Sequence, residues 1–138
     1  MKFDQLRTGV VLRYPYLWAR EAAGGETEGR KPQPTVVGVR VPKPNGEDAL
    51  LLFAITSQPQ RPGRLAAEIP EIEKRRAGLD SQIGLWIMLD EYNLDTIGLS
   101  FYLEPEPPMG RFSQAFFLPL MRAFIARGSS TRGVDRAR

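Results

Sequence analysis

The residues best suited to chemistry close an apolar run, Phe53-Ala54-Ile55-Thr56-Ser57-Gln58, which ends in two hydroxyls and an amide. Residues 50–55 have the length and composition of a buried strand. Side chains at the end of such a strand are held rigidly and remain open to solvent, so this position suits a functional site. The alternative is a simple turn, because Thr and Ser often begin turns.

The chain has 138 residues, with no Cys and no His. It therefore lacks disulfides, thiolate chemistry, a Ser-His-Asp triad and the commonest transition-metal ligand. The acids Glu68, Glu71 and Glu73 have no metal-site spacing and more simply balance nearby basic residues. We expect neither a metal nor a cofactor, so that any catalysis would use Arg, Lys, Tyr, carboxylates or hydroxyls.

Length and charge predict one domain and a flexible end. The length suits a single domain at residues 1–128, and the Gly-rich, Arg-rich segment at 129–138 is expected to be a flexible basic tail. The net charge is +3, and uneven basic patches favour a polyanion or an acidic protein as partner. The first residues form no apolar signal core and no stretch is long enough to span a membrane, which predicts a cytoplasmic protein.

Hydrophobic patterning predicts short strands followed by one helix. Thirteen Gly and 12 Pro favour strands joined by turns over a helical bundle. We expect a C-terminal helix over 112–126, in which Pro119 should cause a kink or a break. The expected fold is mainly β, a small, strongly curved barrel capped by this helix. The strands are expected at 8–16, 35–41, 50–56, 83–89 and within 92–102, with a short strand or turn at 67–72 and a single helical turn at 94–98.

A long polar insertion, residues 19–34, separates the first two predicted strands. Long loops without secondary structure are uncommon in small domains and are often functional. The alternative is a flexible hairpin tip.

The order of these segments resembles the PemK/MazF family of toxin-type endoribonucleases, over about residues 6–101. The resemblance runs through Thr8-Gly9-Val10-Val11, the loop Glu28-Gly29-Arg30-Lys31-Pro32-Gln33-Pro34, and Ala54-Ile55-Thr56-Ser57-Gln58. It continues through Ala67-Glu68-Ile69 and Gly78-Leu79-Asp80-Ser81, and ends at Asp90-Glu91.

This resemblance implies an SH3-like β-barrel that forms a homodimer, binds single-stranded RNA across the dimer face and is inhibited by an acidic antitoxin. It implies cleavage without metal, in which the ribose 2′-hydroxyl attacks the adjacent phosphate. A Thr or Ser at the end of the third strand would stabilise the transition-state oxygens, and Thr56 matches that position. The family Arg precedes the Pro that enters the second strand, and here that residue is Gln33, which has no charge.

The resemblance implies Thr56 as a catalytic residue, and we expect Arg30, three residues before Gln33, to supply the catalytic cation. Contacts to RNA or phosphate are expected from Gln33, Ser57, Lys31, Arg61, Tyr14 and Trp18, of which the two aromatic residues have core or interface packing as an alternative. Because Gln33 replaces Arg, a non-catalytic RNA- or protein-binding module on the same barrel is a second hypothesis. A third is a toxin of the gyrase-poison type that acts through the C-terminal helix.

Overall fold

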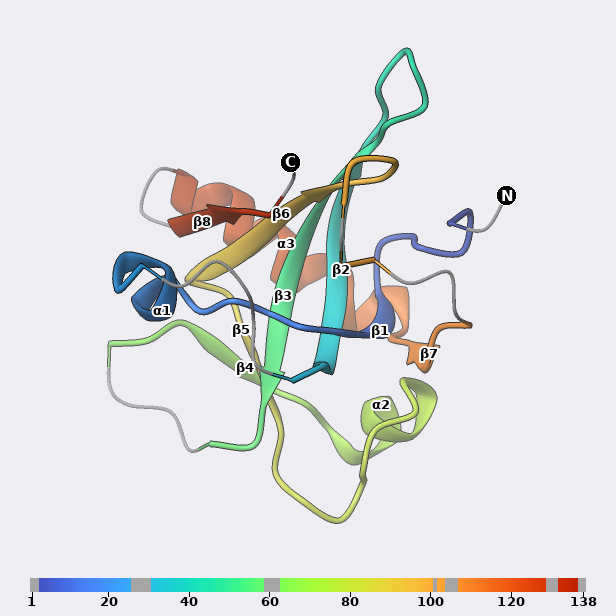
Figure 1. The fold of residues 1–138 in the computed structure, drawn as a ribbon. Coiled ribbons are helices and arrows are strands. Elements are labelled where there is room, and N and C mark those ends of the chain that lie inside the picture. The colour runs from blue at the N-terminus through green and yellow to red at the C-terminus, as the bar shows by residue number, and fades with distance from the viewer. Residues whose placement is uncertain are drawn as a thin grey trace.

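The computed structural model describes residues 3–25, 31–58, 63–100, 102–103, 107–128 and 132–136. It is mainly β, with 33% strand, 22% helix and a C-terminal helix, as predicted, and its strands form an open, largely antiparallel sheet (Figure 1). None of the described helices is both long and apolar enough to cross a bilayer. The strands are β1 (Val10–Tyr14), β2 (Gln33–Val41), β3 (Ala49–Thr56), β4 (Ala66–Glu68), β5 (Trp86–Met88), β6 (Glu91–Thr96), β7 (Gly110–Arg111) and β8 (Arg132–Asp135), and the helices are α1 (Ala19–Ala23), α2 (Glu71–Arg76) and α3 (Gln114–Arg127).

The strand β3 lies at the centre of the sheet and pairs along both of its edges. On one edge it is antiparallel to β2, which continues the sheet through β1 to β7. On the other edge its first half pairs with β6 and its last two residues pair with β5. The sheet branches there, because β4 adds to β5 whereas β8 adds to β6.

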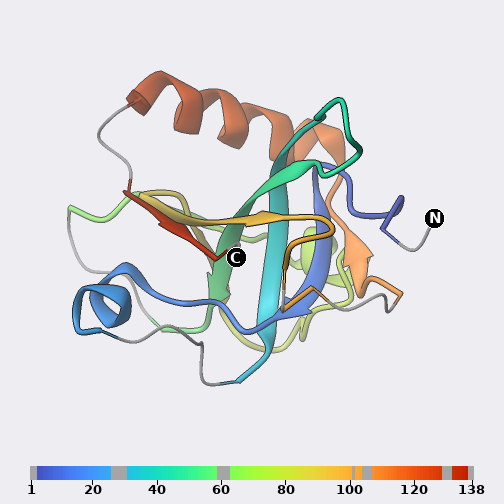
Figure 2. The ribbon, with the colours of Figure 1, turned by 45° about the horizontal axis from the view of Figure 1, so that its top comes forward.

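Side chains from β3 enter two separate hydrophobic cores, one on each face of the sheet. Phe53 and Ile55 point toward the core that α3 covers, and Figure 2 shows this helix lying across one face. Leu50 and Leu52 point to the opposite core, which is closed by the N-terminal segment and by Ile97, Tyr102 and Leu103. This burial on both faces explains why the sequence of β3 is almost continuously apolar.

The first turn of α3 is stabilised by α2. The Ser113 hydroxyl accepts a hydrogen bond from the Phe116 amide, as an N-cap residue does. The buried Glu73 carboxylate of α2 accepts hydrogen bonds from the Ser113 amide (2.8 Å) and hydroxyl (2.7 Å). A carboxylate at this position also interacts favourably with the positive end of the helix dipole.

Three local predictions differ in part from the structure. The helix α3 continues through the exposed Pro119, so the helix does not break there. Residues 94–98 form no helical turn, because β6 extends to Thr96 and is followed by a turn. Residues 67–72 divide between the end of β4 and the start of α2.

The described part of the predicted flexible tail is ordered, which corrects the expectation for residues 129–138. Residues 132–135 form β8, parallel to β6, and the following Arg136 is only 3% exposed. The composition of the segment indicated disorder because it contains few apolar residues. Here backbone pairing and a buried arginine stabilise it instead.

The predicted insertion at residues 19–34 contains structure at both ends. Its first residues form α1, and its last two, Gln33 and Pro34, already belong to β2.

We predict that Glu73→Ala lowers the free energy of unfolding by about 2 kcal/mol, because the amide and hydroxyl of Ser113 lose their acceptor. Urea unfolding followed by circular dichroism measures this change. Glu71→Ala is the matched control, since Glu71 forms only an exposed pair with Arg75 on the same helix (3.0 Å). That variant should change stability by less than about 0.5 kcal/mol. Equal effects would contradict the capping role of Glu73.

Candidate functional site

The candidate site is a row of paired residues across one end of the sheet. Tyr14 of β1 pairs with Gln33 of β2, and Thr56 of β3 pairs with Trp86 of β5, which in turn pairs with Glu68 of β4. Directly paired residues lie on the same face of a sheet. The side chains of this strand-end row therefore share the face opposite α3, since Ile55 and Ile87, their neighbours in sequence, face the α3 core.

Thr56 is half-buried as the last residue of β3. Its hydroxyl oxygen accepts a hydrogen bond from the Gln58 amide at 3.1 Å. The hydroxyl proton of Thr56 can then be donated to another group, such as a phosphate oxygen.

Gln33 lies next to Thr56, because its side-chain Nε2 donates to the backbone carbonyl of Ile55 at 3.3 Å. This bond uses one of the two amide protons and orients the amide along the end of β3. The side-chain oxygen and the second proton are left for other hydrogen bonds. The structure thus brings Gln33 close to Thr56, two of the predicted site residues.

The remaining predicted polar residues have different placements. Ser57 is exposed directly after Thr56, and Lys31 is exposed two residues before Gln33. Arg30, the predicted catalytic cation, and Arg61 both lie outside the described residues.

Tyr14 belongs to the strand-end row by its backbone, but its side chain is fully buried. Its hydroxyl donates to the Asp95 carboxylate at 2.6 Å. Burial, together with the Asp95 carboxylate, raises the pKa of Tyr14 far above its usual value and keeps the hydroxyl protonated. Tyr14 therefore packs in the hydrophobic core, which was the alternative to RNA contact. Its ring presents no open face for an RNA base.

Trp18 precedes α1 and is half-buried. Its ring makes an edge-to-face contact with Tyr16, with centroids 5.1 Å apart, and the Arg20 guanidinium lies 5.1 Å from its centre. Arginine stacked on an aromatic ring is a common feature of single-strand binding surfaces. Trp18 remains a candidate contact, although it is not part of the strand-end row.

Trp86 was not among the predicted site residues, because the sequence around it indicated only a buried strand. It is half-buried and pairs directly with Thr56. Gly84 packs on one side of the indole, where a Cβ would lie 3.1 Å from a ring carbon. Glu68, exposed and next in the row, was considered only as a charge-balancing acid. The sequence held one usable signal, since a tryptophan is a large residue to place near the edge of a short strand.

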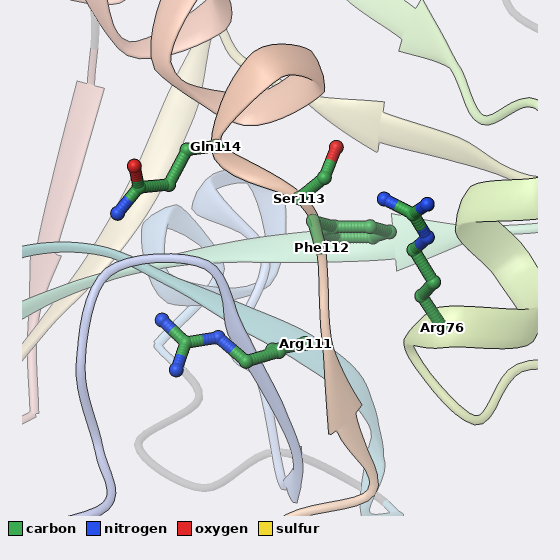
Figure 3. A pocket seen from close by; sticks show the side chains of 5 residues that line it. All are labelled: Arg76, Arg111, Phe112, Ser113 and Gln114. Atoms are coloured by element: carbon green, nitrogen blue, oxygen red, sulfur yellow. The ribbon is translucent and has the colours of Figure 1, made fainter.

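A shallow depression of about 450 Å³ lies elsewhere, at the first turn of α3 (Figure 3). It is lined by Arg76, Arg111, Phe112, Ser113 and Gln114. Figure 3 shows the Arg76 and Arg111 side chains on either side of Phe112 and Ser113. Glu73 already occupies the end of the helix as its anion and lies 3.6 Å from Arg76, so this depression is less suited to a second anion.

In the strand-end row, the hydroxyl and the amide can bind an anion, the indole can stack on a flat ring, and the carboxylate can accept a proton. The row combines a hydroxyl and an amide at adjacent positions with an indole and a carboxylate. Within the described ranges, no three acidic side chains gather closely enough to hold a metal ion.

We predict that Trp86→Leu weakens binding of a short unstructured RNA about tenfold, because one stacked base contributes about 1–3 kcal/mol. Fluorescence anisotropy with a 2′-O-methyl oligonucleotide measures the dissociation constant without cleavage. Trp18→Leu is the matched variant, a half-buried tryptophan outside the row, and should have a smaller effect. If only Trp18→Leu weakens binding, the strand-end row is not the RNA-binding surface.

The strand-end row is thus defined by its geometry alone. No protein-family model, curated protein or solved structure matches this chain.

Proposed function

We propose that the protein is a metal-independent endoribonuclease that cleaves single-stranded RNA in the manner of MazF-type toxins. The observation that carries this proposal is the hydrogen bond from the Gln33 side chain to the Ile55 carbonyl, next to the half-buried Thr56 at the end of β3. These are the residues that the sequence resemblance assigns to the phosphate. Trp86 and Glu68 extend the same row and add the two groups that such a reaction still needs.

In the proposed reaction the ribose 2′-oxygen attacks the adjacent phosphorus and the bond from phosphorus to the 5′-oxygen breaks. Glu68 accepts the 2′-hydroxyl proton, and the leaving 5′-oxygen takes a proton from solvent. Thr56 donates a hydrogen bond to a non-bridging phosphate oxygen, where negative charge develops in the transition state. Trp86 stacks on a neighbouring base and fixes the position of the strand.

The cation in this proposal is Arg30, which directly precedes Lys31 in the sequence. Two cationic side chains would compensate for the uncharged Gln33, whose remaining amide proton binds the phosphate. The products are a cyclic phosphate and a 5′-hydroxyl end.

The proposal includes a finer fold assignment, an SH3-like barrel of the PemK/MazF kind. The branching of the sheet at β3 and the packing of α3 on one face support it. It also includes a homodimer, an acidic antitoxin that competes with RNA, and a cytoplasmic location where RNA is the substrate.

A second function, RNA binding without cleavage, is favoured by one observation. The Gln33 amide donates to the Ile55 carbonyl, and an uncharged group held in this way stabilises a phosphorane much less than a free guanidinium does. A binding module would retain the stacking and hydrogen-bonding groups of the strand-end row.

We predict that the purified protein cuts single-stranded RNA in the presence of EDTA and that Thr56→Ala reduces the rate by about 10²-fold, the order expected for a lost transition-state donor. Gel analysis of an end-labelled oligonucleotide measures cleavage. Thr96→Ala is the matched control. Thr96 is the last residue of β6, is half-buried, and pairs with Ala49 at the end of β3 opposite to Thr56. That variant should cut normally, and circular dichroism should show both variants folded. Cleavage by folded Thr56→Ala at the normal rate would contradict the assigned site.

We further predict that Gln33→Arg increases cleavage at least tenfold, because it adds a charge-assisted contact to the phosphate beside Thr56. The same assay measures the change. Gln58→Arg is the control, since it adds the same charge to the exposed side of the turn after Thr56. A protein that cuts nothing before the substitution and cuts RNA after it would be the binding module rather than the enzyme. If the two variants gain equally, charge alone explains the effect.

A further inference from the structure

The C-terminal segment pairs with the sheet as a bound peptide would. Residues 132–135 lie parallel to β6, in register with residues 91–94, and the Arg136 amide donates to the Leu94 carbonyl. Adding an extended segment to an open strand edge is a common mode of peptide recognition.

The surroundings of this segment favour a particular residue type at two of its positions. A Cβ on Gly133 would lie 2.5 Å from the Tyr92 ring, so only glycine fits there without moving the ring. Three residues later, the Arg136 guanidinium lies 4.0 Å from the centre of the Tyr102 ring and 5.6 Å from that of Tyr14. Its Nη1 donates to the Pro15 carbonyl at 2.8 Å and to the Asn93 side-chain oxygen at 3.1 Å.

This arginine cage, formed by Tyr14, Tyr102, Asn93 and the Pro15 carbonyl, has supports that do not depend on Arg136. Asn93 exchanges two hydrogen bonds with the backbone of Leu17, at 2.9 and 2.7 Å. The Tyr14 hydroxyl is bound to Asp95. The cage is therefore preorganised for a guanidinium, because these hydrogen bonds would remain if Arg136 left the cage.

The bound segment itself is held less completely. The Nε and Nη2 atoms of Arg136 are buried and have no hydrogen-bond partner among the described residues. Buried donors without a partner are costly, and the pairing of β8 is short and parallel. Both features lower the stability of the attached segment.

We propose that the outer edge of β6 and the arginine cage form a peptide-binding site for an extended segment with Gly and Arg three residues apart. Residues 132–136 are its intramolecular ligand, and the same segment of a second copy of this chain is its ligand in trans. This site does not depend on the proposed ribonuclease activity, because Tyr14, the one cage residue in the strand-end row, is buried and takes no part in the proposed reaction.

The test uses the full chain carrying Arg136→Ala, in which the intramolecular ligand is weakened. A fluorescein-labelled peptide of residues 129–138 should bind this variant at least about tenfold more tightly than it binds the unaltered chain, because the site is open more often. Peptides carrying R136A or G133V should not bind, whereas a peptide carrying R138A should bind normally. No binding to the folded variant, or equal binding of the R136A peptide, would overturn the proposal.

A second measurement covers the case in which Arg136→Ala does not fold. A protease recognition sequence replaces residues 129–131 in the otherwise unaltered chain, and the folded protein is then cut. The labelled peptide should replace the cut segment, as followed by anisotropy and mass spectrometry. A cut segment that stays bound and never exchanges would show that β8 is a permanent strand.

Discussion

The structure depends on the hydrogen-bonding requirement of one buried strand. In β3 the middle residues are inaccessible to water, so backbone groups on both edges need partners inside the protein. The strand β2 supplies one edge from Ala49 to Ala54, but the other edge is shared between β6 and β5. This sharing divides the sheet, and the two branches separate beyond it.

The same requirement places the candidate site. Because β5 pairs only with the last residues of β3, Trp86 is brought to Thr56 at the margin of the sheet, where side chains emerge from the core. The neighbouring pair, Ile55 of β3 and Ile87 of β5, still faces α3. The alternation of side chains along β3 thus separates a residue that stabilises the fold from one that can contact a ligand.

Much of this could be predicted from the sequence, and the failures have physical reasons. The apolar runs of β2 and β3 were recognisable, because local patterning identifies the strands of a hairpin. A common site for Gln33 and Thr56 was an expectation from the family resemblance, and the Gln33 side chain contacts the end of β3. The partner of Thr56 across the sheet could not be predicted, because pairing between distant segments leaves no local pattern. The tail was misjudged for a related reason, since the contacts of Arg136 lie with residues as distant as Pro15.

The contact between Glu73 and Ser113, which are 40 residues apart in the chain, joins α2 to α3. No acidic residue occurs in the first turn of α3 itself, so that turn takes its anion from α2. Neither helix is then expected to open alone. Separating α2 from α3 would expose the buried carboxylate and the unpaired start of α3 together, and the two helices should protect their amides from hydrogen exchange as a single cooperative unit.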